Sequence, residues 1–192
     1  FTVSDRTMPP TSLDIGFSPN PCPRKPEAPQ GERIDMKHQL EAELNNTIEW
    51  FNRSTSALTE EDSGFAPASG VFTAAQQVAH AAQTIDWFID GAFRPDGFDV
   101  DFEAHEAKVR AITSLADARA WLAKAAENAR QAIASRSDEE WEQPLPAGPV
   151  MGGLPRAAIF GAITDHTAHH RGALTVYARL NGKTPPMPYM DM

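Results

Sequence analysis

The chain has 192 residues, of which 41% are hydrophobic and 22% are charged, so we expect one folded domain with additional segments. Its 17 basic and 26 acidic residues give a formal charge of −9, without any lysine- and arginine-rich run. Nucleic acid and membranes are therefore not expected as partners, because phosphate binding needs clustered positive charge and no apolar run is long enough to span a bilayer.

The first 35 residues differ in character from the rest of the chain. They hold seven of the 16 prolines, which fix the backbone and remove hydrogen-bond donors. We therefore expect an extended N-terminal arm over residues 1–35 and one folded domain over residues 36–192. Cys22, the only cysteine, lies in the arm and is expected to be a passive thiol. A chain without an internal disulfide fits a reducing, cytoplasmic setting.

Hydrophobic residues recur with the period of an α-helix in four long segments. We expect these helices at about residues 35–56, 73–92, 114–135 and 155–180. The first three begin at side chains that cap helix N-termini, namely Asp35, Thr73 and Ser114. Shorter helical pieces are expected after Thr59, over residues 103–112 and after Ser137.

No segment alternates polar and apolar residues as a strand would, so the pattern predicts an all-α four-helix bundle. The second and third long helices are separated by roughly twenty residues, enough for a crossover connection. The order up-down-down-up is therefore allowed, although the pattern does not require it.

The fourth helix contains DHTAHHRG, residues 165–172, which holds three of the six histidines. At about 100° per residue, His166 and His170 fall one turn apart in the middle of the buried stripe. Buried imidazoles need partners for both ring nitrogens, and either a divalent metal ion or hydrogen bonds would provide them. His169 lies toward the edge of the stripe and is expected outside the ligand set.

His80, in the second helix, is the candidate third ligand. It lies off the centre of the buried stripe of that helix, on nearly the same face as Trp87, so an ordinary side-chain role stays open. Three neutral histidines would leave coordination positions for water or substrate, as in catalytic sites. Zinc, nickel, iron and manganese all suit such ligands. His38 and His105 have polar neighbours and are expected to be exposed.

Two segments carry a family resemblance: QQVAHAAQTIDWF, and DHTAHHRGALTVYARLNGKTPP near the C-terminus. Together they resemble the DinB family, which includes the YfiT-like metal-dependent thiol transferases, over about residues 36–190. The resemblance implies an up-down-down-up bundle that is often a homodimer. It also implies a divalent metal, commonly nickel or zinc, bound by His80, His166 and His170.

For activity, the resemblance implies transfer or isomerisation with a low-molecular-weight thiol such as bacillithiol, mycothiol or glutathione, acting on an electrophilic substrate. Binding of the thiol sulfur to a dication would favour the reactive thiolate. Trp87 and Tyr177 would line the pocket, and Arg171 would pair with a carboxylate or structure the helix. Purely structural roles for these three residues stay open.

Two alternatives to thiol transfer remain. A metal-bound water would make the protein a hydrolase, although no candidate carboxylate base is found on the histidine face. A stress-related metal-binding protein without turnover is the second alternative.

Overall fold

The computed structural model describes residues 35–190, and four long helices make up just over half of them. Their bounds are α1 (Met36–Thr55), α2 (Ala74–Phe93), α4 (Leu115–Ser135) and α6 (Ile159–Leu180). The shorter pieces are η1 (Glu60–Asp62), α3 (Phe102–Arg110), α5 (Asp138–Glu142) and η2 (Arg156–Ala158). The all-α prediction is confirmed, whereas the predicted arm with Cys22 lies, apart from Asp35, outside the described residues.

The helices begin at the side chains that the sequence indicates. Asp35 and Ser114 each accept a hydrogen bond from a backbone N–H in the first turn of their helix. Thr73 and Gln76 form a reciprocal pair, in which each side chain accepts from the other residue's backbone N–H, at 3.3 and 3.0 Å. The fourth long helix differs from the prediction, because Pro155 precedes the short 3₁₀ turn η2 and the α-helix begins only after it.

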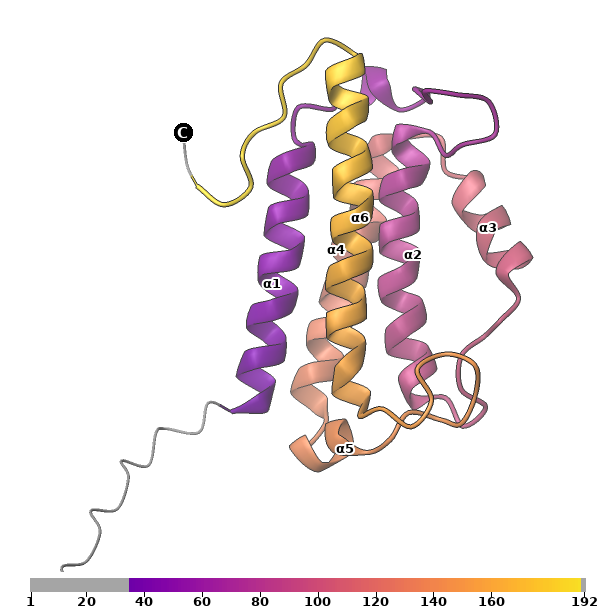
Figure 1. Ribbon diagram of the computed structural model, residues 1–192, viewed down its shortest axis with the longest axis vertical. Helices are drawn as coiled ribbons and strands as arrows, with labels where there is room; N and C mark the ends of the chain where they lie inside the picture. The colour runs from indigo at the N-terminus through magenta and orange to yellow at the C-terminus, as the bar shows by residue number, and fades with distance from the viewer. Residues whose placement is uncertain (1–34, 191–192) are drawn as a thin grey trace, which may run out of the picture. The chain divides into compact units, whose positions relative to one another are not determined.

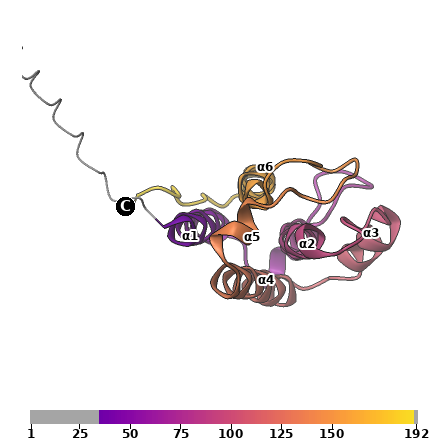
Figure 2. The ribbon, with the colours of Figure 1, turned by 90° about the horizontal axis from the view of Figure 1, so that it is seen from below.

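The long helices form a bundle in which α1 and α6 run upward in Figure 1 and α2 and α4 run downward. The predicted order up-down-down-up is thus confirmed. Viewed along the bundle in Figure 2, each long helix packs against two others, in the ring α1, α6, α2, α4. The crossover from α2 to α4 returns along the outside of the bundle and includes α3, which packs against α2.

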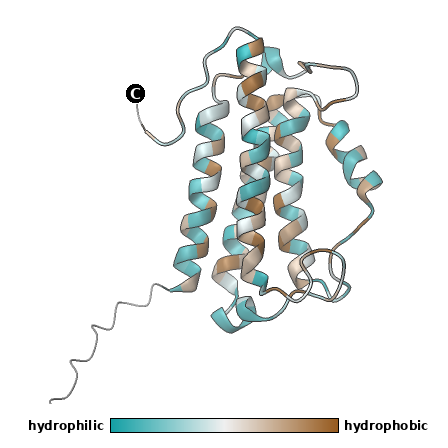
Figure 3. Ribbon diagram, in the orientation of Figure 1, coloured by the Kyte–Doolittle hydropathy of each residue, from teal (hydrophilic) through white to brown (hydrophobic). Residues whose placement is uncertain are grey.

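Helix α2 is the most buried of the four, with fourteen of its twenty residues buried. It contacts α3, α4 and α6, so little of its surface is left for water. Figure 3 shows the result, since α2 is coloured more hydrophobic than α1 or α3. A residue beside the main apolar stripe of α2, such as His80, therefore still faces protein.

The helical period of the apolar residues in α6 extends to Leu180, which is nevertheless not buried. The side chain of Leu180 is 59% exposed, because the last turn of α6 extends beyond the ends of α1 and α2 (Figure 1). None of the helices within residues 35–190 combines the length and the hydrophobicity needed to cross a lipid bilayer.

Candidate metal centre

Three histidines from two helices meet inside the bundle. His166 and His170 lie one turn apart on α6, and His80 faces them from α2. The ring centroids are 4.5 Å apart for the α6 pair, and His80 lies 5.0 Å from His166 and 4.8 Å from His170. One potential ligand atom from each ring lies within 4.8 Å of the other two. The helix wheel places the α6 pair correctly, and the burial of α2 brings the third ring to them.

The spacing of the α6 pair fits a shared metal ion. The Nε2 atoms of His166 and His170 are 3.2 Å apart. Two nitrogens bound to one ion at about 2.0–2.1 Å, at angles between octahedral and tetrahedral, are roughly 2.8–3.4 Å apart. Nδ1 of His166 is buried and has no hydrogen-bond partner among the described residues. The nitrogen donors and their spacing therefore suit a divalent cation bound through the Nε2 atoms.

Burial keeps these rings neutral. It lowers the pKa of His170 to about 3 and that of His166 to about 4, and repulsion between the neighbouring imidazoles adds to the effect. Burial also lowers the pKa of His80. Neutral imidazole is the form that binds metal, so the metal-free cluster is already in the protonation state that binding requires.

A cavity of about 450 Å³ opens beside the cluster and is lined in part by His80 and His166. Its other walls are mostly aromatic and come from α2, from α3 and from the segment before α2. These residues are Phe72, Gln83, Thr84, Trp87, Phe88, Phe102, His105 and Glu106. A molecule in this cavity would touch two of the three histidines, so a metal ion there would be accessible to a small substrate.

The fold of the chain agrees with the comparisons to known proteins. A sequence profile of the DinB superfamily matches residues 38–174 of the chain. The chain belongs to this superfamily. It is similar to the solved structure of YfiT from Bacillus subtilis, described as a probable metal-dependent hydrolase with an unusual four-helix bundle topology. The two share 14% sequence identity over 83% of this chain and 94% of that one, with a TM-score of 0.60. No curated protein sequence matches the chain.

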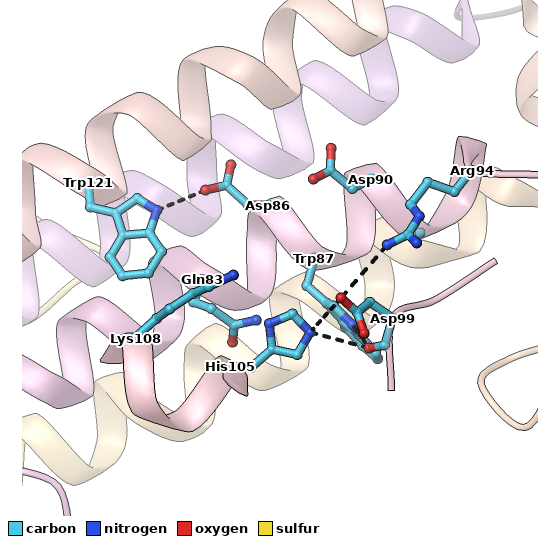
Figure 4. A pocket seen from close by; sticks show the side chains of 10 residues that line it. Gln83, Asp86, Trp87, Asp90, Arg94, Asp99, His105, Lys108 and Trp121 are labelled. Carbon is cyan, nitrogen blue, oxygen red and sulfur yellow. Dashed lines mark hydrogen bonds and ion pairs between the residues drawn. The ribbon is translucent and has the colours of Figure 1, made fainter. Parts of the chain in front are cut away.

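In this member of the DinB superfamily, a second and more polar cavity of about 250 Å³ lies between α2, α3 and α4 (Figure 4). It shares Gln83, Trp87 and His105 with the first cavity, so these three side chains separate the two. Asp86 and Asp90 line it from α2. Burial raises the pKa of Asp90, and the nearby Asp86 carboxylate raises it further.

His105 is the clearest residue that sequence reasoning misplaced. It was expected to be exposed because acidic residues flank it, yet its side chain is only 16% exposed and lines both cavities. Its Nε2 lies 3.3 Å from the backbone carbonyl of Asp99 and 3.7 Å from the carboxylate of the same residue. The indole N–H of Trp87 donates to that carbonyl at 2.7 Å. The loop containing Asp99 thus folds back over α2 and buries the histidine.

The DinB fold of this chain uses a glycine to shape the same wall. A Cβ on Gly91 of α2 would meet the Phe98 ring, with its Cε1 atom 2.6 Å away. Because this position has no side chain, Phe98 lies directly on the helix and packs against Trp87, with their ring centroids 4.8 Å apart. The position of Phe98 beside Trp87 therefore requires glycine at position 91.

The three predicted pocket residues lie in different places. Trp87 lines both cavities. Tyr177 is buried behind the histidines, where its hydroxyl donates to the Phe72 carbonyl at 3.0 Å. Arg171 points away from both cavities and donates to the Tyr189 hydroxyl at 3.0 Å. His169, which was expected outside the ligand set, is exposed, and its ring rests against that of His170.

Proposed function

We propose that the chain binds one divalent metal ion through His80, His166 and His170 and acts as a metal-dependent enzyme on a small molecule in the adjoining cavity. The observation that supports this most is the convergence of three neutral imidazoles at the wall of an aromatic cavity. Three neutral ligands leave coordination positions open and leave the charge of the ion uncompensated. Nickel or zinc is the expected metal, and iron or manganese also suits the donor set.

The proposed reaction is transfer of a low-molecular-weight thiol to an electrophile. A bound divalent ion supplies a Lewis acid that favours the thiolate over the thiol at neutral pH. None of the described residues that line the cavity is a cysteine, and the proposed thiol is a separate molecule. The rings of Phe72, Phe88 and Phe102 would hold the apolar part of the electrophile and exclude water from it.

A second candidate function is metal-dependent hydrolysis, which one specific observation favours. His105 lines the cavity that reaches the histidine cluster, and Asp99 lies against one of its ring nitrogens. This arrangement is typical of a general base, because the acidic partner orients the imidazole. YfiT is itself described as a probable hydrolase.

Metal content and two activity assays test these proposals. We expect about one equivalent of nickel or zinc in the wild-type protein and none in the His166→Ala, His170→Ala double variant. A His38→Ala variant, which changes an exposed histidine on α1, is the matched control and should keep its metal. Absence of metal from the wild-type protein, after supplementation with each ion, would reject the proposed site.

The assays then separate the two reactions. Thiol transfer predicts loss of free thiol in the presence of a model electrophile, for one of bacillithiol, mycothiol or glutathione. Hydrolysis predicts turnover of esters or amides without any thiol, with a decrease of about 10²–10⁴-fold in His105→Gln. Metal retention without either activity would reject both reactions and favour a non-catalytic metal-binding protein.

A further inference from the structure

A line of buried polar groups runs behind His170, on the side of the ring away from His166. The first member is the side-chain oxygen of Gln77 on α2, which lies within hydrogen-bond distance of His170 Nδ1. The amide nitrogen of Gln77 lies 3.2 Å from the Tyr177 hydroxyl on α6, and that hydroxyl lies 3.0 Å from the backbone carbonyl of Phe72. The three side chains are 5–9% exposed, so water does not compete for these bonds.

The direction of every bond in this line follows from its last member. A backbone carbonyl can only accept, so the Tyr177 hydroxyl must donate its single proton to Phe72. The hydroxyl oxygen is then the acceptor for Gln77, which must present its NH₂ group to it. The Gln77 carbonyl oxygen consequently faces His170, and it too can only accept. His170 must therefore carry its proton on Nδ1.

We propose that Gln77 and Tyr177 are positioning residues that lock His170 in the Nδ1–H tautomer and reserve the lone pair of its Nε2 for the metal ion. That lone pair points toward the other histidines, since His170 Nε2 is the atom that lies 3.2 Å from His166 Nε2. This inference rests on the proposed metal site. Hydrogen bonds of this kind orient metal-binding imidazoles and strengthen the bond to the metal.

The line of bonds makes the two α6 ligands unequal. His170 has a partner on Nδ1, whereas Nδ1 of His166 is buried without one among the described residues. His170 is thus held in its binding form before any metal arrives, and His166 must adjust its tautomer when an ion replaces its contact with His170. We infer that His170 is the fixed ligand of the pair and His166 the adaptable one.

The first test measures the tautomer in the metal-free protein by long-range ¹H–¹⁵N NMR of the histidine rings. We expect His170 to be protonated on Nδ1 in the wild type and in Gln77→Glu, which keeps an acceptor oxygen. In Gln77→Leu the Nε2–H form should dominate. Tyr177→Phe removes a single oxygen and leaves the amide free to turn over, so a mixture is expected. The other tyrosine of the chain supplies the matched control, since Tyr189→Phe should leave the tautomer unchanged.

The second test measures metal affinity by competition with a chelator. Loss of such a partner weakens metal binding by about 10–100-fold, which we expect for Gln77→Leu. Tyr177→Phe should fall between this variant and the wild type, and Gln77→Glu should restore tight binding. A wild-type His170 protonated on Nε2, or a Gln77→Leu variant with unchanged tautomer and affinity, would overturn the inference. If the wild-type protein bound no metal, the proposed function would fail, while the tautomer measurement would still decide whether the line of bonds sets the ring.

Discussion

Helix α2 has two buried faces that differ in chemistry. The side that carries Asp86 is directed at α4, because the Asp86 carboxylate accepts from the indole N–H of Trp121 at 2.8 Å. Ala75, Ala79 and Ala82 recur on this side at helical spacing, and all three are fully buried. The side directed at α6 instead carries polar groups, Gln77 and His80, that meet the histidines of that helix.

The face of α2 toward α4 contributes packing, whereas the face toward α6 contributes the polar groups of the proposed site. Small apolar side chains let α2 and α4 approach closely, and their contacts are dispersion and hydrophobic burial. The face toward α6 buries amide, imidazole and hydroxyl groups, each of which must find a partner or lose free energy. The polar groups of that second face belong to the proposed metal site, whereas the alanines of the first face contribute to packing alone.

The largest expected effect is the loss of stabilisation by metal when histidines of the polar face are replaced. Replacing His166 and His170 together by alanine should abolish metal-dependent stabilisation, because two of the three proposed ligands are lost. At a metal concentration a thousand times the dissociation constant, that stabilisation is about 4 kcal/mol. Thermal or urea unfolding with and without metal measures it. A double variant that still gains stability from metal would mean that the ion binds elsewhere.

A substitution in the apolar part of the bundle should lower the free energy of unfolding and leave metal binding unchanged. Leu122 lies in the buried face of α4 and is only 1% exposed. Leu122→Ala should lower the free energy of unfolding by about 3 kcal/mol through lost burial and a residual cavity. Metal content should remain at one equivalent per chain. Loss of metal in this variant would show that the two faces of α2 are coupled.

Mild acidification should lower the free energy of unfolding through the buried histidines of the polar face. The pKa of His166 falls from an ordinary 6.5 to about 4 on folding, and that of His170 to about 3. At a pH between the folded-state pKa values and 6.5, the unfolded chain binds more protons than the folded one. The metal-free protein therefore loses stability as the pH falls below about 6.5. After halving for screening by water, we expect a loss of about 2 kcal/mol at pH 5. Urea titrations across this range measure it, and the double histidine variant should show a much flatter profile.

The smallest effect is expected at the edge of the apolar face. Trp121→Phe removes the indole donor to Asp86 and leaves that carboxylate with the Asn128 amide, 3.4 Å away. The free energy of unfolding should fall by about 1 kcal/mol, with unchanged metal affinity. A change in affinity would link the polar cavity of Figure 4 to the histidine cluster.

The helices of this fold could be predicted because their determinants are local. Asp35, Thr73 and Ser114 cap helices through bonds to residues two or three positions away, and a four-residue spacing places His166 and His170 side by side. The start of the last long helix was predicted too early, since Pro155 directly precedes a short 3₁₀ turn and the α-helix begins only after that turn.

The rest of the site depends on contacts between segments that are distant in sequence. Periodicity put His80 off its stripe, and only the three neighbours of α2 explain its place in the cluster. His105 was misplaced because its partner Asp99 belongs to a loop whose path no periodic pattern encodes. The role of Gln77 follows from the directions of bonds that reach α6, and no local signal points to it.

A substitution at Gly91 would change the cavity wall without changing any of the three clustered histidines. Any larger residue there would push the Phe98 ring off α2, and the stacked Trp87 would shift with it. The aromatic wall would then move while the three imidazoles kept their places two turns or more away along the chain. A substitution at this one position would change the shape of the cavity wall and leave the histidine cluster as it is, so the size of molecule that fits the cavity can change independently of the proposed metal ligands.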